Sequence, residues 1–417
     1  MQMKGNGVMK KRVWMVLFTA VTLLCLVTFT AQASGLMDLF RSQDDTVTIS
    51  REEYDRLKKY EKLDRVMQYV NLWYYQEPDQ DKMLEGAVQG LLLSLEDPYS
   101  FYYNAEDWKT LWEDDEGEYA GIGLNLLGSY LDYTVTIIRV FNDTPAQKAG
   151  VRKGDILVRV EDIEVDAYSM QEAVDVMRGK VGEEVEIEVL RGTEYLTFTM
   201  PRAIIHVNRV ESCMLDNNVG YIALYEFAGD CQTEFGNALT ALQQQGAKAL
   251  VVDLRDNPGG WVDGAVEIAD LFMDKGMLAY SLDRYGSKDP MNTTNGRTDI
   301  PVVFLVNENS ASASEILAGG MHDLGMAKLV GVKTFGKGVI QSVIPLDGMN
   351  IETSEDGFQM TIAQYYFPSG TAVHKVGIEP DVVVEMPEEI KSEYFELGDM
   401  ADPQLKAAWE EAVKLIK

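Results

Sequence analysis

The stretch that decides the fold reads VNENSASASEIL over residues 306–317, where an apolar strand gives way to small residues. Residues 302–306 form the strand, and a helix rich in small residues is expected from about Ser312. A second apolar strand at 248–255 runs into the turn DNPGG at 256–260, and helical spacing follows at 262–272. Strands that alternate with helices in this way predict an α/β domain, here over residues 204–385.

Ser312 stands where a serine can be either a helix cap or a nucleophile. Its spacing to Glu315 is that of a capping box, and the serine cluster taken alone favours a helix cap. Lys337 follows inside a Gly-Lys-Gly triplet, and Gln341 stands shortly after it. Such a triplet alone is typical of a solvated turn. It is also no P-loop, because neither Ser nor Thr follows the lysine.

Residues 116–203 have the period of short strands and turns, with strands expected at 135–140 and 185–190 and a helix at 169–178. An ordinary small β domain with a glycine-rich turn is the simpler interpretation. The segment resembles, however, a PDZ domain of the bacterial protease-associated type, through its glycine-rich loop and the turn at 149–157. The resemblance implies that a substrate's terminal carboxylate binds the backbone of that loop and that the peptide adds as a strand. The loop residues are Gly121, Ile122, Gly123 and Leu124.

The order of these runs along the chain is more specific than any one of them. Residues 306–341, with 253–260 before them and 377–381 after them, resemble the carboxyl-terminal processing peptidases. These are PDZ-bearing serine proteases that use a Ser/Lys dyad. The match extends from about Asp64 to Val384 in the same order. It implies a multidomain α/β (α+β) protein whose protease core is ClpP/crotonase-like, and it implies no cofactor and no metal.

The resemblance assigns a role to each polar group of the site. Ser312 is the nucleophile, Lys337 the general base, and Gln341 the partner that orients the lysine. The backbone N–H of Ala313, at a helix start, can donate to an oxyanion, because N–H groups there lack partners. The family pattern places the second donor at Gly260. Removing one such donor typically lowers the rate by about two to three orders of magnitude.

Lys337 must lose its proton to act as a base, although lysine ordinarily titrates near about 10.4. Burial is the available cause, because it disfavours the charged form. A histidine triad is the competing chemistry, and the chain has only His206, His322 and His374. His322 falls about 15 Å along the same expected helix from Ser312. The other two have no recognisable setting, so we expect all three to be structural.

Three departures from the family pattern lie outside the catalytic positions. Asp256 replaces an asparagine that is common in the turn, and His322 stands where glutamine is common. Phe367 opens a Phe-Pro-Ser-Gly run where Thr-Pro-Ser-Gly is usual. Asp256 brings a carboxylate near the expected oxyanion turn, so normal activity on acidic substrates is not assumed.

Residues 1–33 have the pattern of an export signal. Four cations precede an apolar run from Val13 to Thr30, and Ala-Gln-Ala follows at 31–33. The run is long enough to span a bilayer, so a cleaved signal peptide and a retained single-pass anchor both stay open. In either case the rest of the chain is expected outside the cytoplasm, at the extracytoplasmic face of the membrane or secreted.

Helical patterns flank the other domains. Residues 34–115 are expected to be helical, beginning with a capping box at Ser50 and Glu53. Their apolar stripe is expected to pack within the chain, and a homodimer is left open. Residues 386–417 are acidic and end in a helix that begins at Asp402-Pro403.

Composition excludes several classes of protein. The 417 residues carry a formal net charge of −30, which argues against nucleic acid as a partner. A hydrophobic fraction of 46% excludes a disordered chain. Three cysteines are too few for a disulfide scaffold, and whether Cys213 and Cys231 pair is left open, with two free, half-buried thiols favoured.

The sequence thus predicts an exported serine endopeptidase that binds apolar C-terminal tails of proteins or peptides. The alternative is a non-catalytic PDZ scaffold of the cell envelope.

Overall fold

The computed structural model divides into two compact units, residues 1–83 and 84–417. It describes residues 47–129, 133–294, 296, 298–346, 351, 353–387, 390 and 395–416. The predicted export segment at 1–33 lies outside these residues. Among the helices of the described part, none is long and apolar enough to cross a membrane.

The first unit contains two consecutive amphipathic helices, α2 (Arg51–Lys58) and α3 (Glu61–Trp73). The predicted capping box is confirmed: Glu53 N–H donates to Ser50 Oγ over 3.1 Å, and Ser50 N–H donates to Glu53 Oε2 over 3.3 Å. This unit alone does not bury its apolar stripe, and the expectation that the stripe packs within the chain stays a prediction. No residue of either helix is buried, and Leu63 and Leu72 are exposed.

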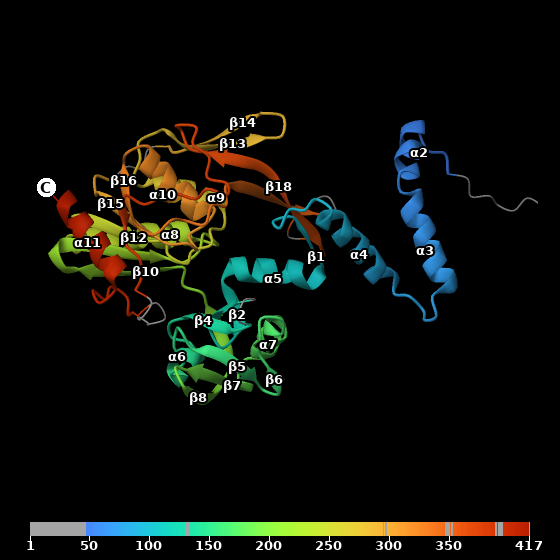
Figure 1. Cartoon of the computed structure of the whole chain (residues 1–417), viewed down its shortest axis with the longest axis horizontal. Coiled ribbons are helices and arrows are strands. Elements are labelled where there is room, and N and C mark those ends of the chain that lie inside the picture. Colours follow the sequence, from blue (N-terminus) through green and yellow to red (C-terminus); the bar gives the residue numbers. More distant parts are fainter. Residues whose placement is uncertain are drawn as a thin grey trace, which may run out of the picture. The chain divides into compact units, whose positions relative to one another are not determined.

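The second unit is built around a six-stranded sheet with the order β10-β11-β12-β15-β16-β19. All neighbours are parallel except β10 and β11 (Figure 1). The strands span Val210–Leu215, Val219–Leu224, Ala249–Asp253, Val302–Val306, Ala327–Gly331 and Val382–Val383, in that order.

Helices cover both faces of this sheet, which explains why its strands read as continuous apolar runs. Alternate residues of a strand point to opposite faces. Leu250 and Val252 of β12 belong to a core that includes residues of α8, α9 and α10, whereas Val251 packs in a second core with α11. These helices span Cys231–Gln244, Val262–Asp270, Ala313–Asp323 and Pro403–Leu415.

A second sheet has the order β1-β18-β13-β14, and β17 also pairs with β18. Helix α4 (Gln80–Leu93) precedes β1, and α5 (Ala105–Glu116) follows it. The strands of this sheet span Phe101–Tyr103, Gly357–Tyr366, Met277–Asp283, Lys288–Asn292 and, for β17, Val339–Pro345. β18 therefore joins a strand from early in the chain to β17, which begins shortly after Lys337.

The segment between α5 and β10 folds as its own small β domain. The strands β2 (Glu118–Gly121) and β9 (Ala203–His206) pair where the chain enters and leaves it. Its sheet has the order β3-β4-β5-β7-β8, with β6 paired to β5. The strand predicted at 135–140 is confirmed as β4, and the helix predicted at 169–178 is α7. The elements β3 to β8, α6 and α7 span Leu124–Gly128, Val135–Val140, Ile156–Val160, Ile163–Glu164, Glu184–Arg191, Glu194–Pro201, Pro145–Ala149 and Met170–Met177.

Both cysteines in the described part are free thiols. Cys213 is half-buried, as expected, but Cys231 is buried at the start of α8, where it belongs to the core beneath the sheet. Burial raises the pKa of the Cys231 thiol to about 12. The expectation of two half-buried thiols is therefore wrong for Cys231.

Candidate active site

Topology brings the turn at 256–260 and the serine cluster together. β12 and β15 are neighbouring parallel strands. The turn at 256–260 follows β12, and the serine cluster follows β15. The carboxyl ends of parallel strands lie at the same edge of a sheet, which is where ligands bind in open α/β sheets. The approach is close, because a Cβ atom on Gly259 would lie 2.7 Å from Ser312 Cβ and 2.9 Å from the N atom of Ala313.

Hydrogen bonds fix this turn while leaving one amide unused. Gly259 N–H donates to Asn257 Oδ1 over 2.9 Å, and Phe227 N–H donates to the carbonyl of Gly259 over 2.8 Å. Trp261 N–H donates back to Phe227 over 2.6 Å. Among the described residues, no hydrogen bond has the N–H of Gly260 or of Ala313 as its donor. The Ala313 donor follows Ser312 directly, and the Gly260 donor belongs to the turn whose Gly259 contacts the serine.

Ser312 caps α10 in a strained conformation, with φ 55° and ψ −115°. A serine rarely adopts a positive φ, and residues held in such conformations gather at functional sites. The residue is 8% exposed. This geometry resembles the sharp strand-to-helix turn that presents the nucleophilic serine in α/β-hydrolases.

Glu315 supplies its half of the predicted capping box and does more besides. Its Oε2 accepts from the N–H of Ser312 over 3.0 Å and from the N–H of Lys337 over 2.9 Å. Its Oε1 accepts from Gly336 N–H over 2.8 Å and from Thr334 Oγ1 over 2.5 Å. Burial raises the pKa of Glu315, although these four hydrogen bonds oppose the rise. One buried carboxylate therefore ties the serine loop to the lysine loop.

Lys337 lies between β16 and β17 with its side chain half-buried. Burial lowers its pKa, as the sequence argument requires, while the charge of Asp97 acts in the opposite direction. Its Nζ lies 4.7 Å from the centroid of the Tyr99 ring. In the described structure no hydrogen bond joins it to the Ser312 hydroxyl, or to Gln341, whose Nε2 donates to Thr361 Oγ1 over 3.0 Å.

Three residues of this site were missed by sequence reasoning. Asp97 and Tyr99 lie in the loop after α4, within the region 34–115 that is expected from the sequence only to be helical. Glu315 was interpreted only as part of a helix cap. A buried-charge pattern gives no signal in a single sequence, so only Glu315, three positions after the serine, had a local signature.

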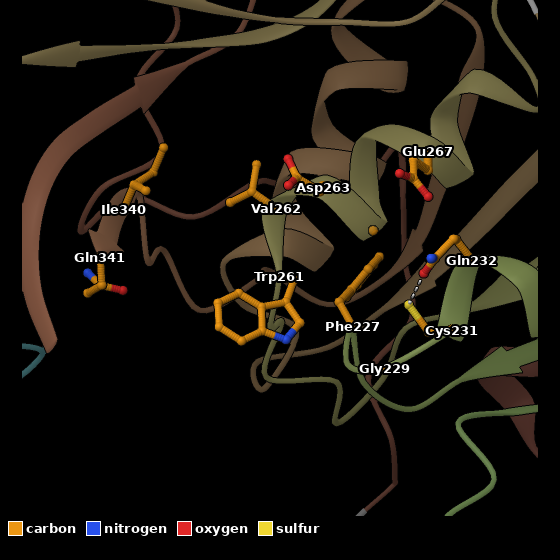
Figure 2. Close-up of a pocket in the computed structure, with 11 residues that line it drawn as sticks. Phe227, Gly229, Cys231, Gln232, Trp261, Val262, Asp263, Glu267, Ile340 and Gln341 are labelled. Carbon is orange, nitrogen blue, oxygen red and sulfur yellow. Dashed lines mark hydrogen bonds between the residues drawn. The ribbon is translucent and has the colours of Figure 1, made fainter. Parts of the chain in front are cut away.

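A cavity of about 340 Å³ opens beside the turn, between the starts of α8 and α9 and the start of β17. Figure 2 shows Trp261 between Gln341 and Phe227, with Asp263 and Glu267 of α9 above them. The Trp261 ring stacks on Trp112 of α5, and its Nε1 donates to Asp115 Oδ1 over 2.5 Å. Helix α5 thus braces the residue that follows Gly260.

Comparison with known proteins identifies the kind of protein this site belongs to. Residues 218–384 match the model of peptidase family S41, residues 137–191 that of a PDZ domain, and residues 25–107 that of the N-terminal domain of the activating protease CtpB. The chain is 33% identical over 379 residues to the carboxy-terminal processing protease CtpA of Bacillus subtilis, covering 90% of this chain and 79% of that protein. This chain belongs to the carboxy-terminal processing protease family.

Other members agree with that assignment. A carboxyl-terminal-processing protease of Synechocystis is 34% identical over 368 residues, which cover 85% of this chain and 84% of the relative. The solved structure of a photosystem II D1 C-terminal processing protease superposes with a TM-score of 0.56 and 26% identity, over 88% of this chain and 99% of that one. The predicted family, the α/β fold class and the PDZ domain are therefore confirmed, and the protein is a serine-type peptidase.

The histidines of this carboxy-terminal processing protease have other surroundings than a triad. His206 pairs with Glu118 over 2.9 Å, and His322 lies 3.2 Å from Asp381. His374 lies against Gly338, one residue beyond Lys337, and burial lowers its pKa. In the described residues its buried Nδ1 has no hydrogen-bond partner.

Asp256, the departure flagged in the turn, is satisfied by neighbours. Its Oδ1 accepts from the side-chain amides of Asn307 and Asn309, each over 2.8 Å. Its Oδ2 lies 3.9 Å from Nζ of Lys153, which belongs to the PDZ domain. Burial alone would raise the pKa of Asp256, but Lys153 and the two amides hold it below its usual range.

Proposed function

We propose that this peptidase cleaves its substrates by a Ser312/Lys337 dyad. Neutral Lys337 accepts the proton of Ser312 as Oγ attacks the scissile carbonyl carbon, and the N–H groups of Ala313 and Gly260 hold the resulting oxyanion. The C–N bond then breaks, and the lysine returns the proton to the leaving amine. Water, deprotonated by the same lysine, hydrolyses the acyl-enzyme and regenerates the serine.

One observation carries this proposal: a serine held at positive φ precedes an unpaired backbone N–H, that of Ala313, and lies against the glycine turn that contains Gly260. Ala313 is buried, and a buried donor without a partner costs free energy, so its persistence beside Ser312 favours a role in binding charge. A purely structural helix cap needs neither the strained serine nor the second amide at Gly260. The lowered pKa of Lys337 adds support, since a base must be neutral.

We propose further that the PDZ domain captures apolar C-terminal tails. The strand β3 is an edge of its sheet, and α7 lies beside it, because a Cβ atom on Gly128 would contact Met170 Sδ at 3.3 Å. Within the described residues, the N–H groups of Ile122 and Gly123 donate no hydrogen bond. A terminal carboxylate can accept from such a loop while the peptide pairs with the free edge. Gly121 and Leu124 frame the loop as the ends of β2 and β3.

Export is proposed from residues 1–33 alone, either as a cleaved signal or as a single-pass anchor. The domain boundaries likewise remain a proposal. They divide the chain into a segment 1–33, a helical region 34–115, a PDZ domain 116–203, a core 204–385 and a C-terminal segment 386–417. The match of residues 25–107 to an N-terminal domain of a related protease supports treating the helical region as a unit.

We also propose that α2 and α3 pair with a second copy of the chain. The two helices carry a continuous set of exposed apolar residues, and Tyr69 stacks on Trp73 with 4.8 Å between ring centroids. Burial of such a set in a homodimer removes apolar surface from water. The exposed members are Tyr54, Leu57, Tyr60, Leu63, Val66, Tyr69, Leu72 and Trp73.

The dyad is tested by cleavage of an unfolded protein with an apolar tail. Ser312→Ala and Lys337→Ala should each reduce cleavage by several orders of magnitude, while both variants keep the folded circular dichroism spectrum. Cleavage at the wild-type rate by either variant would refute the dyad. A wild-type protein that binds tails but never cleaves them would favour the PDZ scaffold instead.

A further inference from the structure

The loop after α4 lies against the side chain of the proposed general base. Tyr99 places its ring face 4.7 Å from Nζ of Lys337, and the charge of Asp97, two residues earlier, acts on the same lysine. Tyr99 is also acted on by the charges of Asp97 and Glu315. Asp97 precedes Lys337 by 240 positions in the sequence, so only the tertiary fold brings the two residues together.

Hydrogen bonds hold this loop in place on β18. Asp97 accepts from Ser100 Oγ over 2.6 Å and from Tyr99 N–H over 3.1 Å. Ser100 Oγ in turn accepts from Thr361 N–H over 3.0 Å, and Gln359 Nε2 donates to the Tyr99 carbonyl over 3.1 Å. The Thr361 hydroxyl is also the acceptor of the Gln341 amide. The loop and the proposed lysine partner therefore share one residue.

The groups that face Lys337 come from three other elements. The loop contributes Asp97 and Tyr99, helix α10 contributes Glu315, and the segment after β18 contributes His374, which lies against Gly338. Glu315 is already engaged by four donors and binds the lysine through its backbone N–H. A carboxylate and the face of an aromatic ring both stabilise an ammonium more than a neutral amine. Burial of the side chain acts in the opposite direction.

We propose that Asp97 and Tyr99 are positioning residues that favour the charged form of Lys337 against the effect of burial, so that this loop sets the pH above which the peptidase is active. The inference rests on the proposed Ser312/Lys337 dyad. A charged lysine cannot accept the serine proton, and a lysine seated on Tyr99 makes no hydrogen bond to Ser312 in the described structure. The loop thus opposes the loss of the Lys337 proton by electrostatic stabilisation of the ammonium.

The test is the rate of fluorophosphonate labelling of Ser312 in the full chain, measured from about pH 5 to 10. Asp97→Asn keeps the size and one acceptor oxygen of the residue but removes its charge, and Tyr99→Leu removes the ring. Each variant should move the acid limb of the profile to lower pH by about half a unit or more. Labelling below the wild-type midpoint should then rise about threefold or more.

Three controls separate electrostatics from general disturbance of the loop. Tyr99→Phe retains the ring face and should keep the wild-type acid limb. Tyr103→Phe alters a neighbouring tyrosine that hydrogen bonds to Gln359 and should also leave the limb in place. His374→Gln should also leave the acid limb in place. A shift of the limb in this variant would assign the titration to the histidine. Thermal unfolding of each variant shows whether it is folded.

The outcomes distinguish this inference from the dyad itself. In the first outcome, Lys337→Ala abolishes labelling, but folded Asp97→Asn and Tyr99→Leu leave the acid limb unmoved or move it to higher pH. The proposed role of the loop is then refuted, and the dyad stands. In the second outcome, Ser312 of Lys337→Ala is labelled as fast as in the wild type. The dyad is then refuted, and the proposed role of the loop is refuted with it.

Discussion

The backbone N–H groups of Ser312 and Lys337 donate to the same atom, Oε2 of Glu315, over 3.0 and 2.9 Å. The two loops follow different strands, and a single buried carboxylate sets the distance between them. This is the strongest structural link between the proposed nucleophile and the proposed base.

Replacement of Glu315 by Gln should disrupt this link. A glutamine amide retains one acceptor oxygen and presents N–H groups where two backbone donors need an acceptor. Each buried donor left unpaired costs about 1–3 kcal/mol. We expect a lower free energy of unfolding and a loss of kcat of at least about tenfold, measured by denaturant titration and steady-state cleavage. Glu410→Gln, exposed on α11, is the matched control, and equal effects of the two changes would contradict the assigned role.

Gly259 should tolerate no side chain. Its φ is +103°, and a Cβ atom there would lie 2.7 Å from Ser312 Cβ. Gly259→Ala should therefore displace the serine or the turn and reduce kcat by about two orders of magnitude or more, as does the loss of an oxyanion donor. Gly246→Ala has a similar φ of +97° but open space around it, so it should cost stability without loss of kcat. Normal turnover by Gly259→Ala would show that the turn does not need this contact.

Asp256→Asn should make stability less dependent on acidic pH. The pKa of Asp256 lies below its ordinary value, so its ionised form stabilises the fold above the unfolded pKa, near about 3.9. That contribution is lost as the pH falls through the lower pKa of the folded state. The wild type should be more stable than the variant by up to about 1 kcal/mol at neutral pH, because surface pairs are screened by solvent.

This difference should be constant above about pH 5 and shrink in stronger acid, as followed by thermal unfolding. Lys153→Ala should reproduce part of it. A stability difference that grew towards low pH would contradict this prediction, because it would mean that ionisation of Asp256 destabilises the fold.

A charge in the proposed tail-binding groove, which lies between the edge strand β3 and α7, should affect substrates only through their tails. Val174, on the partly buried face of α7, packs against the PDZ core. Val174→Glu should raise KM for a substrate with an apolar tail by about tenfold and leave kcat/KM for a short tail-less peptide unchanged. Gln171→Glu puts the same charge on the exposed side of the helix and should change neither. Equal effects on tailed and tail-less substrates would argue against tail capture.

The exposed stripe of the first unit should govern the oligomeric state. Leu63→Glu combined with Leu72→Glu places two charges on it, and light scattering should then report a monomer where the wild type is a dimer at micromolar concentration. Gln68→Glu, also exposed on α3, should remain dimeric. A monomeric wild type would refute this interface.

Local patterns allowed much of the fold to be predicted. The strand predicted at 302–306 is β15 without change of bounds, and the helix predicted at 262–272 begins at Val262 as expected but ends at Asp270. Both signals depend on neighbours in sequence, since periodicity and caps are local properties. The stripe on α2 and α3 shows the limit: the pattern reveals an apolar face but not what covers it.

The proposed site could be predicted only in part for the same reason. Ser312, Lys337 and the Gly259-Gly260 turn lie in one region because β12, β15 and β16 are adjacent in a parallel sheet. Asp97 and Tyr99 reach the lysine through a strand pairing, β1 with β18, that joins distant parts of the chain. No local pattern encodes that pairing, so local reasoning cannot place this loop in the environment of the lysine.

The most direct test of the central claim is the mass of the covalent adduct on the nucleophile, an acyl-enzyme from an ester or a phosphonyl-enzyme from a fluorophosphonate. The purified full chain is mixed with a slowly turned-over ester or a fluorophosphonate, quenched in acid and digested for mass spectrometry. The account predicts one adduct, on Ser312, that is absent from Ser312→Ala and greatly slowed in Lys337→Ala. An adduct on another residue, or labelling of Ser312 at an unchanged rate without Lys337, would contradict it.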